Sequence, residues 1–104
     1  MSRMGRVLTA ARATVPAEHA AEYLAALREL QACRHRRGEH LWVFRHPREA
    51  GVFLEFAESA SADTHPLTGA EPPEERSLEL RLQALAAYAP DARVLWEEIP
   101  LEEP

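Results

Sequence analysis

The chain has 104 residues and 11.7 kDa, and its net charge of −5 gives a sequence pI near 5.5. This length suits one domain with one hydrophobic core, predicted over residues 1–104, and the acidic charge argues against nucleic acid, which requires a clustered basic surface. The single cysteine excludes an internal disulfide, and no apolar run approaches the roughly 20 residues of a membrane span, so we expect a cytoplasmic protein without membrane insertion. The chain contains neither lysine nor asparagine, which excludes Schiff-base chemistry and a phosphate-loop lysine.

The periodicity of the chain predicts six regular elements and one long loop. Alternation with a period of two marks the strands, and apolar residues recurring every three or four positions mark the helices. Pro16 suits the start of the first helix and Gly38 its end, while Pro90 breaks the second helix. In chain order the predicted elements are a strand at 6–15, a helix at 17–36, a strand at 39–46, a turn at 47–51, a strand at 52–58, an irregular loop at 59–73, a helix at 74–88, a strand at 92–99 and an acidic tail at 100–104.

This order of elements predicts an α+β fold of the ferredoxin-like β-α-β-β-α-β type, with an antiparallel sheet and two helices on one face. In a monomer the other face would meet water, so each strand should be apolar on one side only. The second strand instead carries Leu41 and Val43 on one side and Trp42 and Phe44 on the other. Such an apolar face is covered when two copies pack together, which predicts a homodimer, a monomer being the alternative.

A set of residues along the second and third predicted strands supports a family comparison. It comprises Arg37-Gly38, Trp42, Phe44-Arg45, Pro47, Gly51, Phe53, Glu55 and Glu58-Ser59. In this order the chain resembles the dimeric α/β-barrel proteins related to the antibiotic-biosynthesis monooxygenases, and especially the soluble domains that follow major-facilitator-type transporters. The resemblance covers nearly the whole chain and implies a dimeric α/β barrel, with His65 as the nearest match to a later His of those domains. Ala60 departs from the pattern, because relatives commonly have Trp there.

The resemblance also bears on chemistry and cofactors. Haem-degrading relatives depend on an Asn, a Trp and a His, and this chain has no Asn at all. Quinone-forming relatives need no cofactor, and nothing in the sequence excludes that class. We therefore expect no bound cofactor, and His65 is the candidate catalytic base, because its loop could cover a cavity mouth and histidine titrates near neutral pH.

Histidine and cysteine spacing predicts no metal site. His40 and His46 share a strand face but lie roughly 20 Å apart at about 3.3 Å per residue. Cys33 and His35 point about 200° apart on a helix of 3.6 residues per turn. Neither pair has the spacing that zinc requires.

Three charged residues form the candidate ligand site. We expect Arg12, Glu55 and Arg93 to lie on the open faces of neighbouring strands and to converge inside a dimer cavity, with Trp42 nearby. Buried charges are costly unless paired and often mark binding sites, and an arginine suits a carboxylate or a phenolate. The alternative is a structural ion pair that sets the register of the dimer.

Three functions follow from these observations. The first is a homodimer whose cavity binds a small aromatic or anionic metabolite without a tightly held cofactor. The second is a cofactor-independent monooxygenase that arranges Trp42, Arg12 and His65 around a phenolic substrate. The third is a non-catalytic dimerisation or accessory module, whose cavity would be filled by its own side chains.

Overall fold

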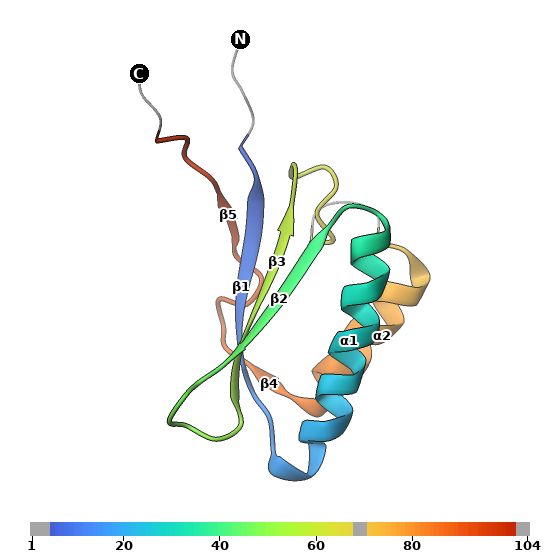
Figure 1. The fold of residues 1–104 in the computed structure, drawn as a ribbon, viewed down its shortest axis with the longest axis vertical. Coiled ribbons are helices and arrows are strands. Elements are labelled where there is room, and N and C mark those ends of the chain that lie inside the picture. Colours follow the sequence, from blue (N-terminus) through green and yellow to red (C-terminus); the bar gives the residue numbers. More distant parts are fainter. Residues whose placement is uncertain (1–4, 68–70, 102–104) are drawn as a thin grey trace.

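The computed structural model describes residues 5–67 and 71–101, and it contains one antiparallel sheet with two helices beside it (Figure 1). The elements are β1 (Val7–Thr14), the short 3-10 helix η1 (Ala17–His19), α1 (Ala20–Arg36), β2 (His40–Arg45), β3 (Val52–Ser59), α2 (Pro73–Leu85), β4 (Ala87–Tyr88) and β5 (Leu95–Glu97). The predicted order of elements is confirmed. Part of the loop predicted at 59–73 and part of the tail predicted at 100–104 lie outside the described residues.

The sheet runs β2-β3-β1-β4, and β5 also pairs with β1. β1 pairs along its whole length with β3, from Val7 opposite Ser59 to Thr14 opposite Val52. Its other edge is shared by two short strands, because β5 pairs with its start and β4 with its end. The chain between β4 and β5 turns away from the sheet at this edge.

The end of α2 differs from the prediction. The second helix was expected to reach Tyr88, but it ends at Leu85, because Ala86 is extended and residues 87–88 pair with β1. The expected strand at 92–99 is reduced to β5, since two turn hydrogen bonds, from the amides of Ala92 and Val94, fold the chain between the two short strands. Helix propensity in this Ala-rich segment is weaker than the sheet hydrogen bonds available at the edge of β1.

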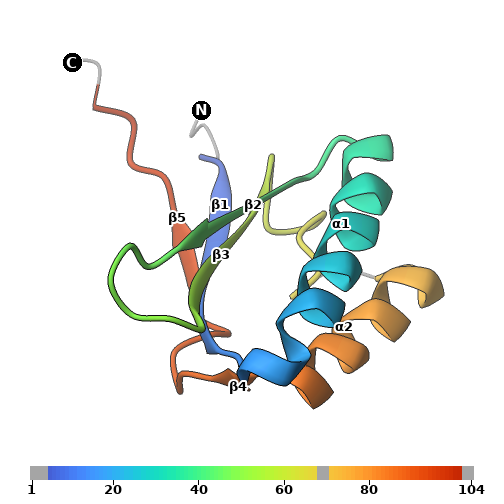
Figure 2. The same cartoon turned by 60° about the horizontal axis from the view of Figure 1, so that its bottom comes forward.

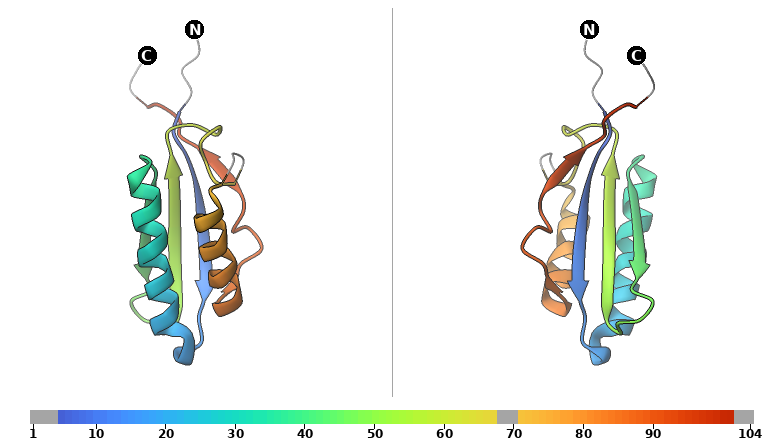
Figure 3. Two further views of the ribbon diagram at one scale, coloured as in Figure 1. Left: turned by 90° about the vertical axis from the view of Figure 1, so that its right-hand side faces the viewer. Right: turned by 90° about the vertical axis from the view of Figure 1, so that its left-hand side faces the viewer.

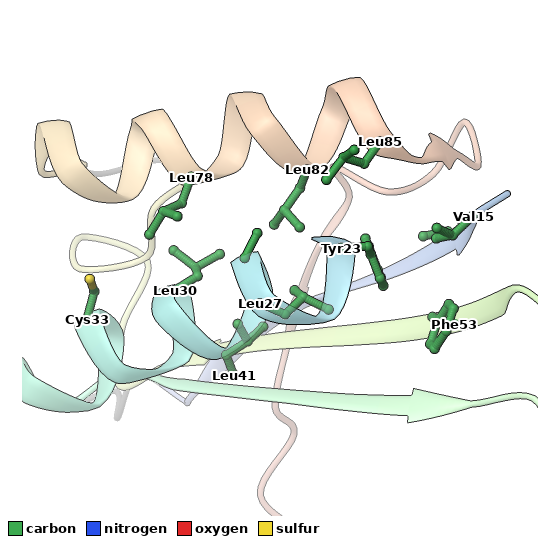
Figure 4. Packing of buried hydrophobic residues seen from close by; sticks show 12 residues of the cluster. Val15, Tyr23, Leu27, Leu30, Cys33, Leu41, Phe53, Leu78, Leu82 and Leu85 are labelled. Carbon is green, nitrogen blue, oxygen red and sulfur yellow. The ribbon is translucent and has the colours of Figure 1, made fainter. Parts of the chain in front are cut away.

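Both helices lie on the same face of the sheet (Figures 2 and 3). α1 buries Tyr23, Leu27 and Leu30, which recur at helical spacing, and α2 buries Leu78 and Leu82 against them. Figure 4 shows these side chains meeting between the helices and the sheet. The turn between β2 and β3 also supports this arrangement: it ends at Gly51, whose φ is +79° and whose amide oxygen accepts a hydrogen bond from the amide of Val15.

The side chains of β3 face the opposite way from the prediction. The register with β1 places Phe53, Glu55 and Ala57 towards the helices. The apolar set Val52, Leu54 and Phe56 therefore lies on the open face. Large apolar side chains are exposed on or beside that face: Trp42 by 43%, Phe44 by 57% and Trp96 by 55%. The prediction of apolar residues on both faces is confirmed, but the assignment of faces at β3 is wrong.

Candidate functional site

A cavity of about 850 Å³ lies on the helix side of the sheet. Its sheet wall is made of Thr9 and Ala11 from β1 and Ala57 from β3, and α2 and the turn before β5 form other walls. Small side chains at these sheet positions leave a volume that larger apolar residues would fill. The space exists because this part of the inner face is not packed against a helix as tightly as the core around α1.

α2 presents two different faces. Glu75, Leu78, Leu82 and Leu85 are buried towards the core. The residues of α2 that line the cavity recur at positions i, i+3, i+4 and i+7: Arg76, Glu79, Leu80 and Gln83. That spacing puts them on one stripe of the helix. One face of α2 therefore stabilises the fold and the other forms the cavity wall.

Glu55 is the buried carboxylate of the cavity. Its Oε2 atom accepts hydrogen bonds from the hydroxyl groups of Tyr23, at 2.6 Å, and Tyr88, at 2.7 Å. Burial raises the pKa of Glu55, and the two tyrosine hydrogen bonds oppose that rise. Burial and the neighbouring carboxylate also raise the pKa of both tyrosines, so they remain hydroxyl donors. Within the described part of the chain no hydrogen-bond partner reaches the second oxygen, Oε1.

A buried arginine organises the carboxylates on the far wall. Arg34 is only 3% exposed and forms ion pairs with Glu75 at 3.3 Å, Glu71 at 3.4 Å and Glu79 at 3.4 Å. Arg37 pairs with Glu75 at 2.7 Å. Burial and the neighbouring Glu79 raise the pKa of Glu71 to about 7, whereas the two arginines lower the pKa of Glu75 despite burial. These groups satisfy one another and pin the start of α2 to α1.

His65 lies in the cavity wall, but both its ring nitrogens are occupied. Nε2 lies 3.0 Å from the carbonyl oxygen of Ala57, and Nδ1 accepts the amide hydrogen of Leu67 at 3.0 Å. This pattern requires the neutral tautomer with hydrogen on Nε2. Burial lowers the pKa of His65, which favours the same neutral form. The geometry anchors the loop to β3, and a catalytic role for His65 stays a prediction.

Two arginines at the cavity lack an ion-pair partner among the described residues. Arg76 on α2 and Arg93 in the turn before β5 both line the cavity and are exposed. Neither has an ion-pair partner among residues 5–67 and 71–101. They differ in this from Arg34, whose charge is compensated by three carboxylates.

The structure brings together only part of the predicted site. Glu55 and Arg93 line one cavity, but it lies on the helix side of the sheet and inside a single copy, not between the open faces of a dimer, and Arg93 lies in the turn before β5 and not in a strand. Their role in ligand binding stays a prediction. Arg12 lies on the opposite face, where its nearest carboxylate is Glu49 at 3.8 Å, so the expected convergence of the three charges is wrong. The error follows from the reversed face of β3, which turns Glu55 inward.

Trp42 lies on the open face, away from the cavity. Its ring stacks on that of His40, with centroids 5.3 Å apart and planes 3° from parallel. It borders a smaller groove of about 380 Å³ together with Trp96 and Glu58. Within one copy, Trp42 and Arg12 therefore do not surround a common substrate with His65, and a ligand role for Trp42 stays a prediction.

Some residues of the site were not predicted from the sequence. Tyr88 was predicted at the end of the second helix, and Tyr23, Glu71 and Arg76 were given no role. No local signal identifies them, because each joins the site through contacts between distant segments, such as the 33 positions that separate Tyr88 from Glu55.

Two properties of the described residues bear on metals and membranes. They contain no group of three or more His, Cys, Asp or Glu side chains that could hold a metal ion. Nor does any helix in residues 5–67 and 71–101 have the length and apolar character to cross a membrane.

Comparison with known proteins identifies the fold. No family model matches the chain, and no curated protein matches it. Among solved structures, a candidate antibiotic biosynthesis monooxygenase from Caulobacter crescentus superposes with a TM-score of 0.74 at 16% identity, covering 93% of this chain and 92% of that one. A variant of SnoaB, a cofactor-independent oxygenase from Streptomyces nogalater, superposes with a TM-score of 0.73 at 17% identity, covering 95% of this chain and 96% of that one.

A third similar structure is a conserved protein of unknown function from Bacteroides thetaiotaomicron, described as a possible oxidoreductase. It has a TM-score of 0.74 at 15% identity and covers 92% of this chain and 98% of that one. The predicted α+β, ferredoxin-like fold is thereby confirmed, and it is the fold of antibiotic-biosynthesis-monooxygenase-like proteins.

Proposed function

We propose that this chain is a single-domain protein that binds a small organic anion in the cavity beneath α2, without a resident cofactor. The cavity itself is the observation that carries the proposal: about 850 Å³ of space lined by a buried carboxylate and by two arginines without described ion-pair partners. Ligand sites are typically concave, with a few converging polar groups and perturbed pKa values. An accessory module with a cavity filled by its own side chains would lack this space.

The same proposal includes a homodimer formed through the open face of the sheet. Trp42, Phe44 and Trp96 are each about half exposed there, around the apolar row from Val52 to Phe56. A soluble protein rarely leaves such a surface uncovered, and a second copy offers a matching surface through a two-fold axis. The cavity lies on the other side of the sheet, so each copy would hold its own ligand.

The first test is native mass spectrometry of the full, untagged chain. We expect a species of about twice 11.7 kDa, with ligand mass that is released on denaturation. A monomer at every protein concentration would contradict the dimer. A Phe44→Ser variant should shift the equilibrium towards monomer. Leu80→Ser, at an exposed apolar residue on α2, is the control for the oligomeric state alone, because Leu80 lines the cavity.

The second test measures binding in the cavity with a fluorescent aromatic anion, anilinonaphthalene sulfonate. Ala57→Leu should fill the cavity floor and abolish binding, because the added side chain occupies the ligand volume. The dye could also bind the exposed aromatic side chains of the open face, so the control is Phe44→Ser. This variant should keep the part of the dye fluorescence that Ala57→Leu removes. Unchanged dye binding in Ala57→Leu would reject the cavity as the binding site.

A cofactor-independent monooxygenase is the second candidate. The structural similarity to SnoaB favours it, as does Glu55, a buried carboxylate facing the cavity. Such a carboxylate can accept the proton of a phenolic substrate as a general base. The test is oxygen uptake with a panel of polyphenols. An enzyme is supported if uptake is lost in Glu55→Gln and retained in Glu29→Gln, which changes an exposed glutamate of α1. No uptake with the wild-type chain would contradict an enzyme.

A further inference from the structure

Glu55 is the buried carboxylate that lines the cavity. Glu55 is 8% exposed and already accepts two hydroxyl hydrogen bonds, both on Oε2. Its Oε1 has no partner among the described residues, although the side chain lines the cavity. Every fully buried side-chain oxygen and nitrogen of the described residues has a hydrogen-bond partner, so Oε1 is open to the cavity, and a ligand that displaces water from this atom is favoured when it donates a hydrogen bond in return. A hydroxyl suits this atom best, because it donates to an ionised carboxylate and can also accept from a protonated one.

Two exposed arginines line another part of the cavity. Arg76 approaches from α2 and Arg93 from the turn before β5, and both are exposed and lack a described ion-pair partner. The other charged groups of the wall are paired with one another, Arg34 with Glu71 and Glu79. A guanidinium binds a carboxylate with two hydrogen bonds, so these two arginines favour a carboxylate of the ligand.

We infer that the ligand is a small hydroxy acid, with its carboxylate on Arg76 and Arg93 and its hydroxyl on Oε1 of Glu55. This inference rests on the proposed binding function and adds the class and orientation of the ligand. Neither Glu55 nor the arginines select this class alone: a simple acid leaves Oε1 unpaired, and a simple alcohol leaves the arginines unpaired. The small residues Ala11 and Ala57 between the two ends leave room for a carbon skeleton.

The test compares three probes on the full chain by isothermal titration calorimetry: the hydroxybenzoate isomers, benzoate and phenol. At least one hydroxybenzoate should bind roughly tenfold or more tightly than benzoate, and likewise than phenol, because each probe lacks one charge-assisted hydrogen-bonding group. In Glu55→Gln the ratio of hydroxybenzoate affinity to benzoate affinity should shrink. In the double variant Arg76→Leu/Arg93→Leu the ratio of hydroxybenzoate affinity to phenol affinity should fall to about one. Arg28→Leu and Glu29→Gln, at exposed positions of α1 outside the cavity, are the controls and should change neither ratio.

The outcomes separate this inference from the function on which it rests. Hydroxybenzoates that bind no better than benzoate and phenol, or advantages that survive in the variants, overturn the hydroxy acid. If the dye still binds and Ala57→Leu still abolishes it, the cavity remains a binding site for another class of anion. If Ala57→Leu affects neither dye nor hydroxybenzoate binding, the cavity function itself fails.

Discussion

Replacing Tyr23 with Phe tests the hydrogen bond at the centre of the site. Tyr23 is fully buried, and its hydroxyl donates to Oε2 of Glu55 at 2.6 Å. Phe keeps the ring that packs on Phe53, with centroids 5.0 Å apart, so the change removes the hydroxyl alone. Because Tyr23 is 0% exposed, the change leaves a buried carboxylate oxygen with one donor fewer. A hydrogen bond to a charged group contributes about 1.5–3 kcal/mol, so we expect a loss of about 2 kcal/mol in the free energy of unfolding.

The assay is urea and thermal unfolding at one fixed chain concentration, because the stability of a dimer depends on concentration. A loss of about 2 kcal/mol should lower Tm by about 8–16 °C in a domain of this size. The loss should be larger at pH 8 than near the ordinary carboxyl pKa of 4.5, since the hydroxyl stabilises the ionised form of Glu55 and opposes the burial that raises its pKa. Tyr88→Phe is the matched control on the same oxygen: Tyr88 is only partly buried, so water can replace its hydroxyl and the loss should be smaller.

A double-mutant cycle isolates the interaction. Glu55→Gln keeps an oxygen acceptor of the same shape but removes the charge, so the cost of Tyr23→Phe should fall in that background. A change of less than about 0.5 kcal/mol for Tyr23→Phe at pH 8, the range of ordinary surface substitutions, would refute the hydrogen bond and the buried position of Glu55 together.

Three further predictions concern the fold and its pH dependence. Leu82→Ala, at a position 1% exposed between the helices, should cost about 2–5 kcal/mol in urea unfolding, whereas Leu80→Ala on the exposed side of α2 should cost far less. Gly51→Ala should destabilise by about 1 kcal/mol or more, because φ is +79° and a Cβ would lie 2.6 Å from the carbonyl oxygen of Val15. Burial and Glu79 raise the pKa of Glu71 to about 7, so the folded state favours its protonated form. The free energy of unfolding should therefore fall as pH rises from about 4.5 to about 7 and then level off. Glu71→Gln should flatten this fall, as measured by Tm at each pH.

The order of elements could be predicted because it depends on local patterns. Period-two alternation and helical spacing each occupy one stretch of chain, and Gly38, with a φ of +79°, ends α1 as expected. The end of α2 could not be predicted in the same way. Ala86, Ala87 and Ala89 are good helix formers, but the segment pairs with β1, which lies more than 70 positions earlier in the chain. Tertiary hydrogen bonds here outweigh local propensity.

The face of β3 was assigned wrongly for a related reason. The rule that the more apolar side faces the core favours Val52, Leu54 and Phe56 over a set that contains Glu55. The rule fails here because β3 carries apolar side chains on both faces, so apolar character alone does not identify the inner face. Glu55 is turned inward by the register with β1 and is held there by two tyrosine hydroxyls. The charge of Glu55 can be read from the sequence, but the two hydroxyl groups that donate to it depend on the tertiary fold.

The two faces of the sheet can therefore be explained together. The face covered by helices contains the polar cavity, with Glu55 at its floor, and the face left open by the helices contains the large apolar side chains, with Trp42 and Phe44 among them. Each arrangement is unfavourable in an isolated copy: burial raises the pKa of Glu55, so its charge costs folding free energy, and exposed aromatic rings cost hydration free energy. A ligand in the cavity would offset the first cost, and a second copy on the open face would offset the second. Because the two costs lie on opposite sides of one sheet, they can be removed independently, which is why a variant at Phe44 and a variant at Ala57 are expected to separate pairing from binding.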